Sequence, residues 1–473
     1  MGAIRIAAML ALALAMAACA TRPINPSIQH VDRSAGYRYQ TRQQYDDDKE
    51  NLVVLAFSGG GTRAAAFSYG VLEELRRTEV VGPLGKRRLL DEVDIVTGVS
   101  GGSFTALAYG LYGEKLFDEY EKRFLKRNVQ GNLITQLFNP KRWSSLWSDG
   151  WGRSELAAEM YDEYLFEGAT FGDLNRRPGP LIIASATDIS TGSRLAFIQT
   201  DFDLLCSNLE SVPLSRAAAA SSAVPLVLSP VTLNNYGGTC GFQWPRWAQM
   251  MKDPKASARP AGRALQRLRE MEAFQDSKHR PYIHLVDGGV ADNLGMRSIL
   301  EALEELEAMR AAGRATRLDK VRRIIVLVVN SLSSPKTNWD ASPRPPNDLA
   351  ILLKAAGVPI DRYSYEAVEL LKDIVARWRA LRRLRESGVF APGANESLKE
   401  LVDAPDIDIY AIDVSFAALK DKAEVEYLND LPTSFVLPDE AVDRLRRAAG
   451  VIIRESPEFR RLLQDVGVTL AER

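Results

Sequence analysis

The sequence is poor in several features that would assign a protein to a class at once. Its 60 basic and 61 acidic residues give a net charge of −1, which lends no support to a nucleic-acid partner. No apolar segment reaches the length of a bilayer-spanning helix. No internal repeat is visible. Histidine and cysteine are scarce, with three of each, so each residue can be weighed separately.

The N-terminus carries the pattern of an export signal. A short basic stretch precedes an apolar run over residues 6–18, which is too short to span a bilayer and suits a signal sequence. The run ends in Met16-Ala17-Ala18-Cys19, which resembles a bacterial lipobox. We therefore expect a signal peptide over residues 1–18, lipid on Cys19 and a place in the cell envelope. Ala20 favours the outer membrane, facing the periplasm. The alternative is a buried N-terminal helix with an incidental cysteine.

Residues 19–50 have the composition of a linker. They are rich in proline, serine, glutamine and charge, and they contain few large apolar residues that could form a core. We expect a disordered tether with a span of roughly 30 Å between the membrane anchor and a globular domain.

The other two cysteines form an even pair if Cys19 carries lipid. Export places Cys206 and Cys240 in an oxidising compartment, which predicts a disulfide between them. Two isolated thiols are the alternative. The segment between them includes Ala217–Pro225, a run of small residues that we expect to form a helix near the catalytic elements.

A glycine run follows the first strand that the sequence predicts. Residues 52–57 are continuously apolar, as in a strand buried on both faces, and residues 64–77 have helical composition. Between them lies Ser58 and then Gly59-Gly60-Gly61-Thr62-Arg63, whose amide groups can bind an anion. A P-loop would need Gly-Lys-Ser/Thr, and a dinucleotide site would need glycine where Ala64 stands. An oxyanion hole remains.

A second strand–glycine–helix unit surrounds Ser100. The segment Gly98-Val99-Ser100-Gly101-Gly102 follows an apolar strand and precedes a helical run, which is the setting that a G-x-S-x-G nucleophile requires. Gly98 and Gly102 are small enough to let strand and helix approach. The pattern predicts that Ser100 is a nucleophile, although such turns also occur for packing reasons alone.

The base for Ser100 is the open question. Asp287 ends a predicted strand and is followed by Gly288 and Gly289, in the place where α/β sheets carry their chemistry. A turn-forming aspartate is the alternative for this stretch alone. His284 is the best-placed histidine, but residues three apart on a strand face opposite ways. A Ser100–Asp287 dyad is therefore favoured over a Ser–His–Asp triad.

The whole chain reads as an α/β protein with a main domain and a C-terminal addition. Its composition is 46% apolar and 26% charged, and its length exceeds what one core usually absorbs. We expect one catalytic domain over residues 51–335, which an α-rich C-terminal extension over 336–473 completes. Trp143, Trp147 and Trp151 are spaced as one helix face, with core or membrane contact as the alternatives. An arginine-rich face at 377–385 is most simply solvated.

Taken together, these motifs resemble those of the patatin-like phospholipase family, over about residues 51–300. The shared features are the glycine run, the Ser100 elbow, Asp287-Gly288-Gly289 and the Ala-Ser-Ser-Ala-Val-Pro run at 220–225. Ser58 and Ala64 depart from the usual Asp and Gly.

The resemblance implies a three-layer α/β/α fold with a mainly parallel sheet and a partly helical C-terminal extension. It implies hydrolysis of acyl esters, commonly phospholipids, without metal or cofactor. Ser100 would be the nucleophile, Asp287 the base, and Gly60 and Gly61 with their neighbours the oxyanion hole. An ordinary esterase that uses His284 and an inactive envelope lipoprotein are the competing hypotheses.

Overall fold

The structure is a computed structural model that describes residues 22–43, 50–82, 85–140, 151–251, 262–303, 321–335, 337, 339–387 and 407–466. The chain divides into two compact units. The first unit consists of residues up to Thr41, Asp118–Arg177 and Ala184–Val290. The second unit consists of Arg42–Phe117, Pro178–Ile183 and Ala291–Arg473.

The second unit is built on parallel strands. In the described residues these are β1 (Asn51–Phe57), β4 (Val93–Val99), β9 (Arg323–Asn330) and β10 (Asp408–Ser415), in the spatial order β10-β9-β1-β4. Strands β1 and β9 are nearly continuous runs of apolar residues, because both faces of a parallel sheet are covered, whereas β10, at the end of the strand order, carries polar residues beside its buried ones. Strand β1 was expected from its continuous apolar run, and β4 is the apolar strand that was expected before Ser100.

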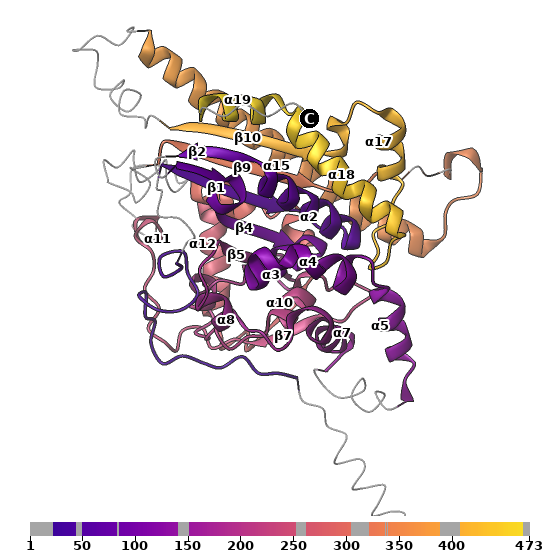
Figure 1. Cartoon of the computed structure of the whole chain (residues 1–473). Helices are drawn as coiled ribbons and strands as arrows, with labels where there is room; N and C mark the ends of the chain where they lie inside the picture. The colour runs from indigo at the N-terminus through magenta and orange to yellow at the C-terminus, as the bar shows by residue number, and fades with distance from the viewer. Residues whose placement is uncertain are drawn as a thin grey trace, which may run out of the picture. The chain divides into compact units, whose positions relative to one another are not determined.

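Helices cover both faces of these parallel strands. On one face, α15 (Asp348–Glu386) shares a buried cluster with β1 and β9, which includes Leu371, Val54 and Val326. On the other, α2 (Gly61–Arg77), α3 (Gly101–Tyr112) and α18 (Asp439–Glu455) form a layer (Figure 1). The expected three-layer α/β/α arrangement is confirmed.

The C-terminal residues complete this fold rather than forming a domain of their own. Strand β10 pairs with β9, and α19 (Pro457–Asp465) packs against β10. The two compact units thus cut across the expected boundary at residue 335. The other described elements of the second unit are β2 (Glu79–Gly82), β3 (Gly85–Arg88), η1 (Leu89–Glu92), η2 (Gly113–Lys115), η6 (Trp339–Ala341), η8 (Phe416–Ala418) and α17 (Lys422–Asn429).

The first unit has antiparallel pairing instead. Strand β8 (Tyr282–Val286) pairs with β7 (Val231–Asn234) and with the end of β5 (Leu181–Asp188), which also pairs with β6 (Arg194–Ala196). The expectation of a mainly parallel sheet is confirmed, and the antiparallel pairs of this mixed sheet lie in the first unit. The described helices around these strands are η3 (Glu121–Leu125), α5 (Val129–Leu137), α7 (Arg153–Tyr161), η5 (Asp162–Phe166), α8 (Phe171–Asn175), α9 (Gln199–Phe202), α10 (Leu214–Ser221), α11 (Arg246–Met251) and α12 (Gly262–Gln275).

Two short elements, α4 (Leu116–Tyr120) and α13 (Gly289–Asp292), fall where the chain passes between the units. Among the described helices, none is long and apolar enough to cross a membrane.

The expected disordered tether is wrong for residues 22–41, which we call the N-terminal strap. Tyr37 is fully buried, and Arg38 forms a buried bidentate ion pair with Asp203 at 2.7 and 3.1 Å. Asn25 donates a hydrogen bond to the Ser207 hydroxyl at 2.9 Å. Buried hydrogen bonds and one aromatic ring thus order a segment that lacks an apolar core of its own. Cys19 and residues 1–18 lie outside the described residues.

The expected disulfide is confirmed. Cys206 and Cys240 are bonded, with their Cα atoms 5.5 Å apart. The N-terminal strap lies along this bridge, because Ile28 N–H donates to the Cys206 carbonyl oxygen at 2.9 Å. The disulfide and the strap therefore stabilise the same part of the first unit.

The tryptophan series and the arginine-rich face both contribute to packing where the structure describes them. Trp151 is buried, which favours the core interpretation for this residue, whereas 143 and 147 lie outside the described residues. The arginine-rich face of α15 is more than a solvated surface. Arg379 pairs with Glu458 of α19, and Arg382 pairs with Asp408 of β10.

Candidate functional site

Ser100 sits on a strained turn between β4 and α3. Its backbone has φ +47° and ψ −121°, a conformation that serine rarely adopts and that costs about 1–3 kcal/mol. The residue is 5% exposed. Strand, strained serine and helix follow one another as the G-x-S-x-G pattern predicts, so the turn has the geometry of a nucleophile elbow.

The glycines around Ser100 are required by close backbone contacts. A Cβ atom on Gly102 would lie 2.6 Å from the Ser58 carbonyl oxygen, and one on Gly98 would lie 2.7 Å from the Ser103 Cα. A Cβ atom on Gly101 would overlap the carbonyl oxygen of Gly61. Gly98 and Gly102 were expected on these grounds, whereas the tightest contact, at Gly101, was not.

These contacts place the glycine run beside the nucleophile. Gly60 has φ +139° and Gly61 has φ +60°, so the run turns sharply between β1 and α2. A Cβ atom on Gly59 would lie 3.3 Å from the Ser100 Cβ. Two motifs that lie far apart in the sequence therefore meet within the second unit.

Two of the five expected oxyanion donors are already used by the fold. Gly59 N–H donates to the Asn293 carbonyl oxygen at 2.9 Å, and Thr62 N–H donates to the Ser434 carbonyl oxygen at 2.8 Å. The expectation that Gly59 and Thr62 belong to the hole is therefore wrong. In the described part of the chain, the amides of Gly60 and Gly61 have no acceptor, which leaves them to bind an oxyanion.

The Arg63 side chain fastens the loop to the C-terminal region, while the expectation for its backbone amide stays a prediction. The guanidinium is buried and donates to the Ser331 oxygen at 2.8 Å, the Leu431 oxygen at 2.7 Å and the Thr433 hydroxyl at 3.1 Å. Burial lowers the pKa of Arg63 to about 10, opposed by the charge of Asp361. The residue positions the glycine run rather than facing a substrate.

A pair of serines closes the other side of the loop. The hydroxyls of Ser58 and Ser331 lie 3.0 Å apart, and Ser331 N–H donates to the Ser58 hydroxyl at 2.9 Å. The Ser331 hydroxyl also bonds the Gly59 carbonyl oxygen at 3.0 Å. The family resemblance leads one to expect aspartate at this position. Ser58 is neutral instead, and it forms a hydrogen-bonded pair with Ser331.

Asn293 is a site residue that sequence reasoning missed. Besides accepting from Gly59 N–H, it donates from Nδ2 to the Ser364 hydroxyl at 3.4 Å. Its Oδ1 lies 2.6 Å from the position of a Cβ on Gly59. The sole sequence signal was its place directly after the Asp287 motif.

Asp287 lies in the first unit and follows β8. Its N–H donates to the Ala223 carbonyl oxygen at 2.9 Å, and Gly288 N–H donates to the Ser221 carbonyl oxygen at 3.0 Å. The Thr187 hydroxyl donates to the Asp287 carbonyl oxygen at 2.9 Å. The small-residue helix expected near the catalytic elements does contact Asp287, through its C-terminal turn.

The carboxylate of Asp287 is buried and oriented by its own turn. The residue is 8% exposed, and its Oδ1 accepts a hydrogen bond from Gly289 N–H at 2.7 Å. Gly288 and Gly289 therefore serve the Asp287 turn through their amides. Ser100 belongs to the second unit and Asp287 to the first.

The hydrogen bonds that hold the Asp287 turn do not involve the side chain of His284. It is exposed on β8, and its Nδ1 lies 3.0 Å from the Thr232 hydroxyl on β7. Its strand neighbours Ile283 and Leu285 are buried. The alternation along β8 thus agrees with the expected opposite orientation of His284 and Asp287.

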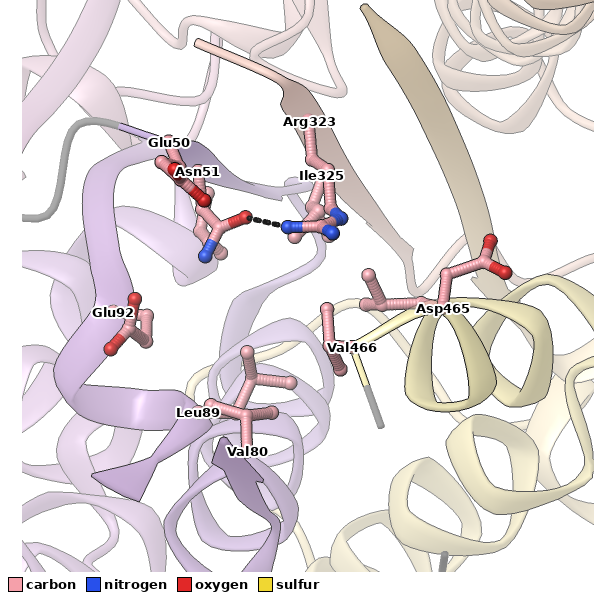
Figure 2. A pocket seen from close by; sticks show the side chains of 11 residues that line it. Glu50, Asn51, Val80, Leu89, Glu92, Arg323, Ile325, Asp465 and Val466 are labelled. Carbon is pink, nitrogen blue, oxygen red and sulfur yellow. Dashed lines mark hydrogen bonds between the residues drawn. The ribbon is translucent and has the colours of Figure 1, made fainter. Parts of the chain in front are cut away.

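A pocket occurs at the other end of the parallel strands (Figure 2). It has a volume of about 250 Å³ and lies at the amino ends of β1 and β9, where Arg323 bonds Asn51 at 3.4 Å. Glu50, Glu92 and Asp465 also line it. Ser100 follows the carboxyl end of β4, so this pocket is not part of its site. Among the described residues, no group of three or more His, Cys, Asp or Glu could hold a metal ion.

The fold is thus an α/β arrangement in which a strained strand–helix turn at Ser100 lies beside a glycine-rich loop. A family model described as patatin-like phospholipase matches residues 55–300, more than half of the chain. The chain belongs to the patatin-like phospholipase family, a family of lipid ester hydrolases.

Individual relatives are more distant. A cGAMP-activated phospholipase of Escherichia coli (strain TW11681) is 30% identical over 190 residues, which cover 39% of this chain and 49% of the relative. The chain thus spans about half the length of that protein. Among solved structures, human GIVD cytosolic phospholipase A2 aligns with 89% of this chain and 63% of its own, at 13% identity and a TM-score of 0.41. VipD from Legionella pneumophila aligns with 96% and 72%, at 10% identity and a TM-score of 0.31.

Proposed function

We propose that this chain is a serine acyl-ester hydrolase of the phospholipase A or lysophospholipase type. One observation carries the proposal: the strained Ser100 elbow is packed against the Gly60-Gly61 backbone, whose amides are left without an acceptor. A nucleophile beside two such donors is the arrangement that acyl transfer requires.

In the proposed reaction, Ser100 and Asp287 act as a dyad. The Ser100 oxygen attacks the acyl carbonyl carbon while its proton passes to the Asp287 carboxylate. The Gly60 and Gly61 amides and the N-terminus of α3 stabilise the oxyanion. Asp287 then returns the proton to the departing alcohol, which leaves an acyl-Ser100 ester. Water, deprotonated by Asp287, then attacks the acyl carbon; the bond to the Ser100 oxygen breaks, Asp287 returns the proton to that oxygen, and the fatty acid leaves.

Two features support Asp287 as the base. A carboxylate is a weak base at its reference pKa of about 4, so it must be shielded from water to serve here, and Asp287 is largely buried. The chain also runs from Asp287 through the short α13 to Asn293, whose carbonyl binds the Gly59 amide beside Ser100.

The alternatives are less well supported. A Ser–His–Asp esterase would need His284, which is exposed and bonded to Thr232. An inactive envelope lipoprotein is less well supported, because backbone strain of the kind seen at Ser100 is concentrated at functional sites.

We further propose that Cys19 is lipidated and that the protein is attached to the outer membrane, facing the periplasm. The lipobox-like sequence supports this proposal. Because the N-terminal strap is ordered from Arg22 onward, few residues separate Cys19 from the first unit, so the anchor would hold that unit close to the membrane. Release of a Cys19→Ser variant from the membrane fraction is the expected result, and retention would contradict it.

Fluorophosphonate labelling tests the proposed chemistry. We expect one covalent adduct, mapped to Ser100 by mass spectrometry and absent from Ser100→Ala. Product profiling with mixed bacterial lipids should then show free fatty acid and a deacylated lipid. No adduct on the folded protein, together with no fatty-acid release, would support the inactive scaffold.

A further inference from the structure

Helix α15 consists of two unlike halves. After Pro359, the helix packs on the parallel sheet through buried residues such as Leu371 and Ile374. Before Pro359, three aliphatic side chains are exposed: Ile351 is 45%, Leu352 54% and Val358 38% exposed. Because proline removes a helical hydrogen bond and crowds the preceding turn, it marks the natural division between the halves.

The exposed half, residues 348–358, is unusually apolar for a surface helix. Its one internal charge between Asp348 and Asp361 is Lys354. The helix has a proper start, since the Asn347 side chain accepts from Ala350 N–H at 2.9 Å. A helix in water normally turns polar residues outward, so an ordered helix with this composition indicates an apolar environment on its exposed side.

The next turn of the same helix reaches the nucleophile site. Asp361 interacts electrostatically with Arg63, which fastens the glycine run. Ser364 accepts from Asn293, whose carbonyl binds the Gly59 amide. The exposed half therefore leads directly into the residues that hold the oxyanion loop.

We propose that residues 348–358 form an interfacial helix that inserts into a lipid bilayer and places the Ser100 site at the membrane surface. The inference rests on the proposed function, since a lipid ester bond lies at the boundary between acyl chains and head groups. At 1.5 Å per residue the segment is about 16 Å long, too short to cross a core of about 30 Å. It lies in the interface instead.

Two further features suit a bilayer as the occupant. Tyr363 and Tyr365 are exposed on the turns that follow, where the helix approaches the site, and tyrosine favours the head-group level. Lys354 can extend its amine to the phosphate layer while its methylene groups stay among the acyl chains. A second copy of this chain would bury the aliphatic side chains but would leave the tyrosines and Lys354 without this complementarity.

Vesicle binding tests the inference without requiring turnover. The full chain carrying Cys19→Ser and Ser100→Ala is sedimented with sucrose-loaded phosphatidylcholine vesicles. Adding Ile351→Glu and Leu352→Glu should lower the partition coefficient at least about tenfold, because two buried aliphatic side chains are lost. Leu384→Glu, an equally exposed leucine at the far end of α15, is the matched control and should change it less than about twofold. Equal binding by the double-glutamate variant would overturn the inference.

A second measurement decides the case if that variant does not fold. Leu352→Trp in the same background should show a blue-shifted fluorescence and quenching by bromine-labelled acyl chains. An unshifted, unquenched tryptophan would overturn the inference, as would a dimer that the glutamates convert to monomer, because a second copy would then cover the helix. Because these proteins lack Ser100, failure of insertion and failure of the proposed chemistry are separate results.

Discussion

Ser100 and Asp287 are held in place by different means. Around Ser100, backbone lies directly against backbone, and added methyl groups at Gly98, Gly101 or Gly102 would overlap main-chain atoms. Around Asp287, the turn is held by hydrogen bonds from its own amides and from Thr187. Ser100 is therefore positioned by close backbone packing, which tolerates no added atom, whereas the Asp287 turn is positioned by polar contacts, which can be weakened one at a time.

The largest effect is expected at Gly101. Gly101→Ala places a methyl group on the Gly61 carbonyl oxygen, which displaces the elbow from the oxyanion loop. We expect kcat/KM for a soluble acyl ester to fall at least about hundredfold, as displacements near 1 Å do in other enzymes. Gly262→Ala is the control, because a Cβ there meets nothing within 4 Å. Unchanged activity in Gly101→Ala would refute steric positioning.

Removal of the disulfide tests how much the stability of the first unit depends on individual bonds. It closes a sequence separation of 34 residues, so Cys206→Ser with Cys240→Ser should lower the free energy of unfolding by about 3–4 kcal/mol. Because Ile28 bonds the Cys206 carbonyl, the N-terminal strap should also become more open to proteolysis. Chemical denaturation and limited proteolysis measure the two effects. An unchanged unfolding midpoint would contradict the prediction.

A substitution at Arg63 distinguishes a role in holding the glycine run in place from a direct role in catalysis. Arg63→Lys keeps the positive charge but cannot make all three bonds, so we expect a loss of about 2–3 kcal/mol in stability. Arg77→Lys, exposed on the same helix, is the control and should be neutral. If Arg63→Lys kept full stability and lost activity alone, Arg63 would belong to the oxyanion hole after all.

The smallest effect is expected at Thr187. Thr187→Val removes the hydroxyl that donates to the Asp287 carbonyl and should cost about 1–2 kcal/mol in stability, with a fall in kcat rather than a rise in KM. Thr78→Val loses an equivalent buried bond, to the Glu74 carbonyl at 2.9 Å, without touching Asp287. Equal kinetics in the two variants would mean that this bond does not position Asp287.

Local sequence patterns were sufficient for the elements but not for all of the site. Aliphatic runs identified β1 and β9, and the glycine spacing identified the Ser100 turn, because these signals are contiguous. The partners of the Gly59 and Thr62 amides are Asn293 and Ser434, which are far away in sequence. No local pattern reveals which amides a distant carbonyl group will bind. The sequence therefore predicted more oxyanion donors than the structure leaves available.

Two other segments differ from what the local sequence predicts, and in both the cause again lies in contacts outside the segment. The N-terminal strap was taken as disordered because its order comes from buried polar contacts such as Arg38–Asp203, which leave no hydrophobic period. The first half of α15 was missed because Gly357 and Pro359 are helix-breaking residues. In both cases tertiary or environmental contacts outweigh local propensity.

The proposed dyad depends on the Asp287 carboxylate serving as the base for Ser100. The most direct test compares kcat/KM of Asp287→Asn with that of His284→Ala on one soluble acyl ester, after both are shown to be folded. We predict a loss of at least about hundredfold in Asp287→Asn and less than about twofold in His284→Ala. Full activity in Asp287→Asn, or an equal loss in His284→Ala, would contradict the Ser–Asp dyad.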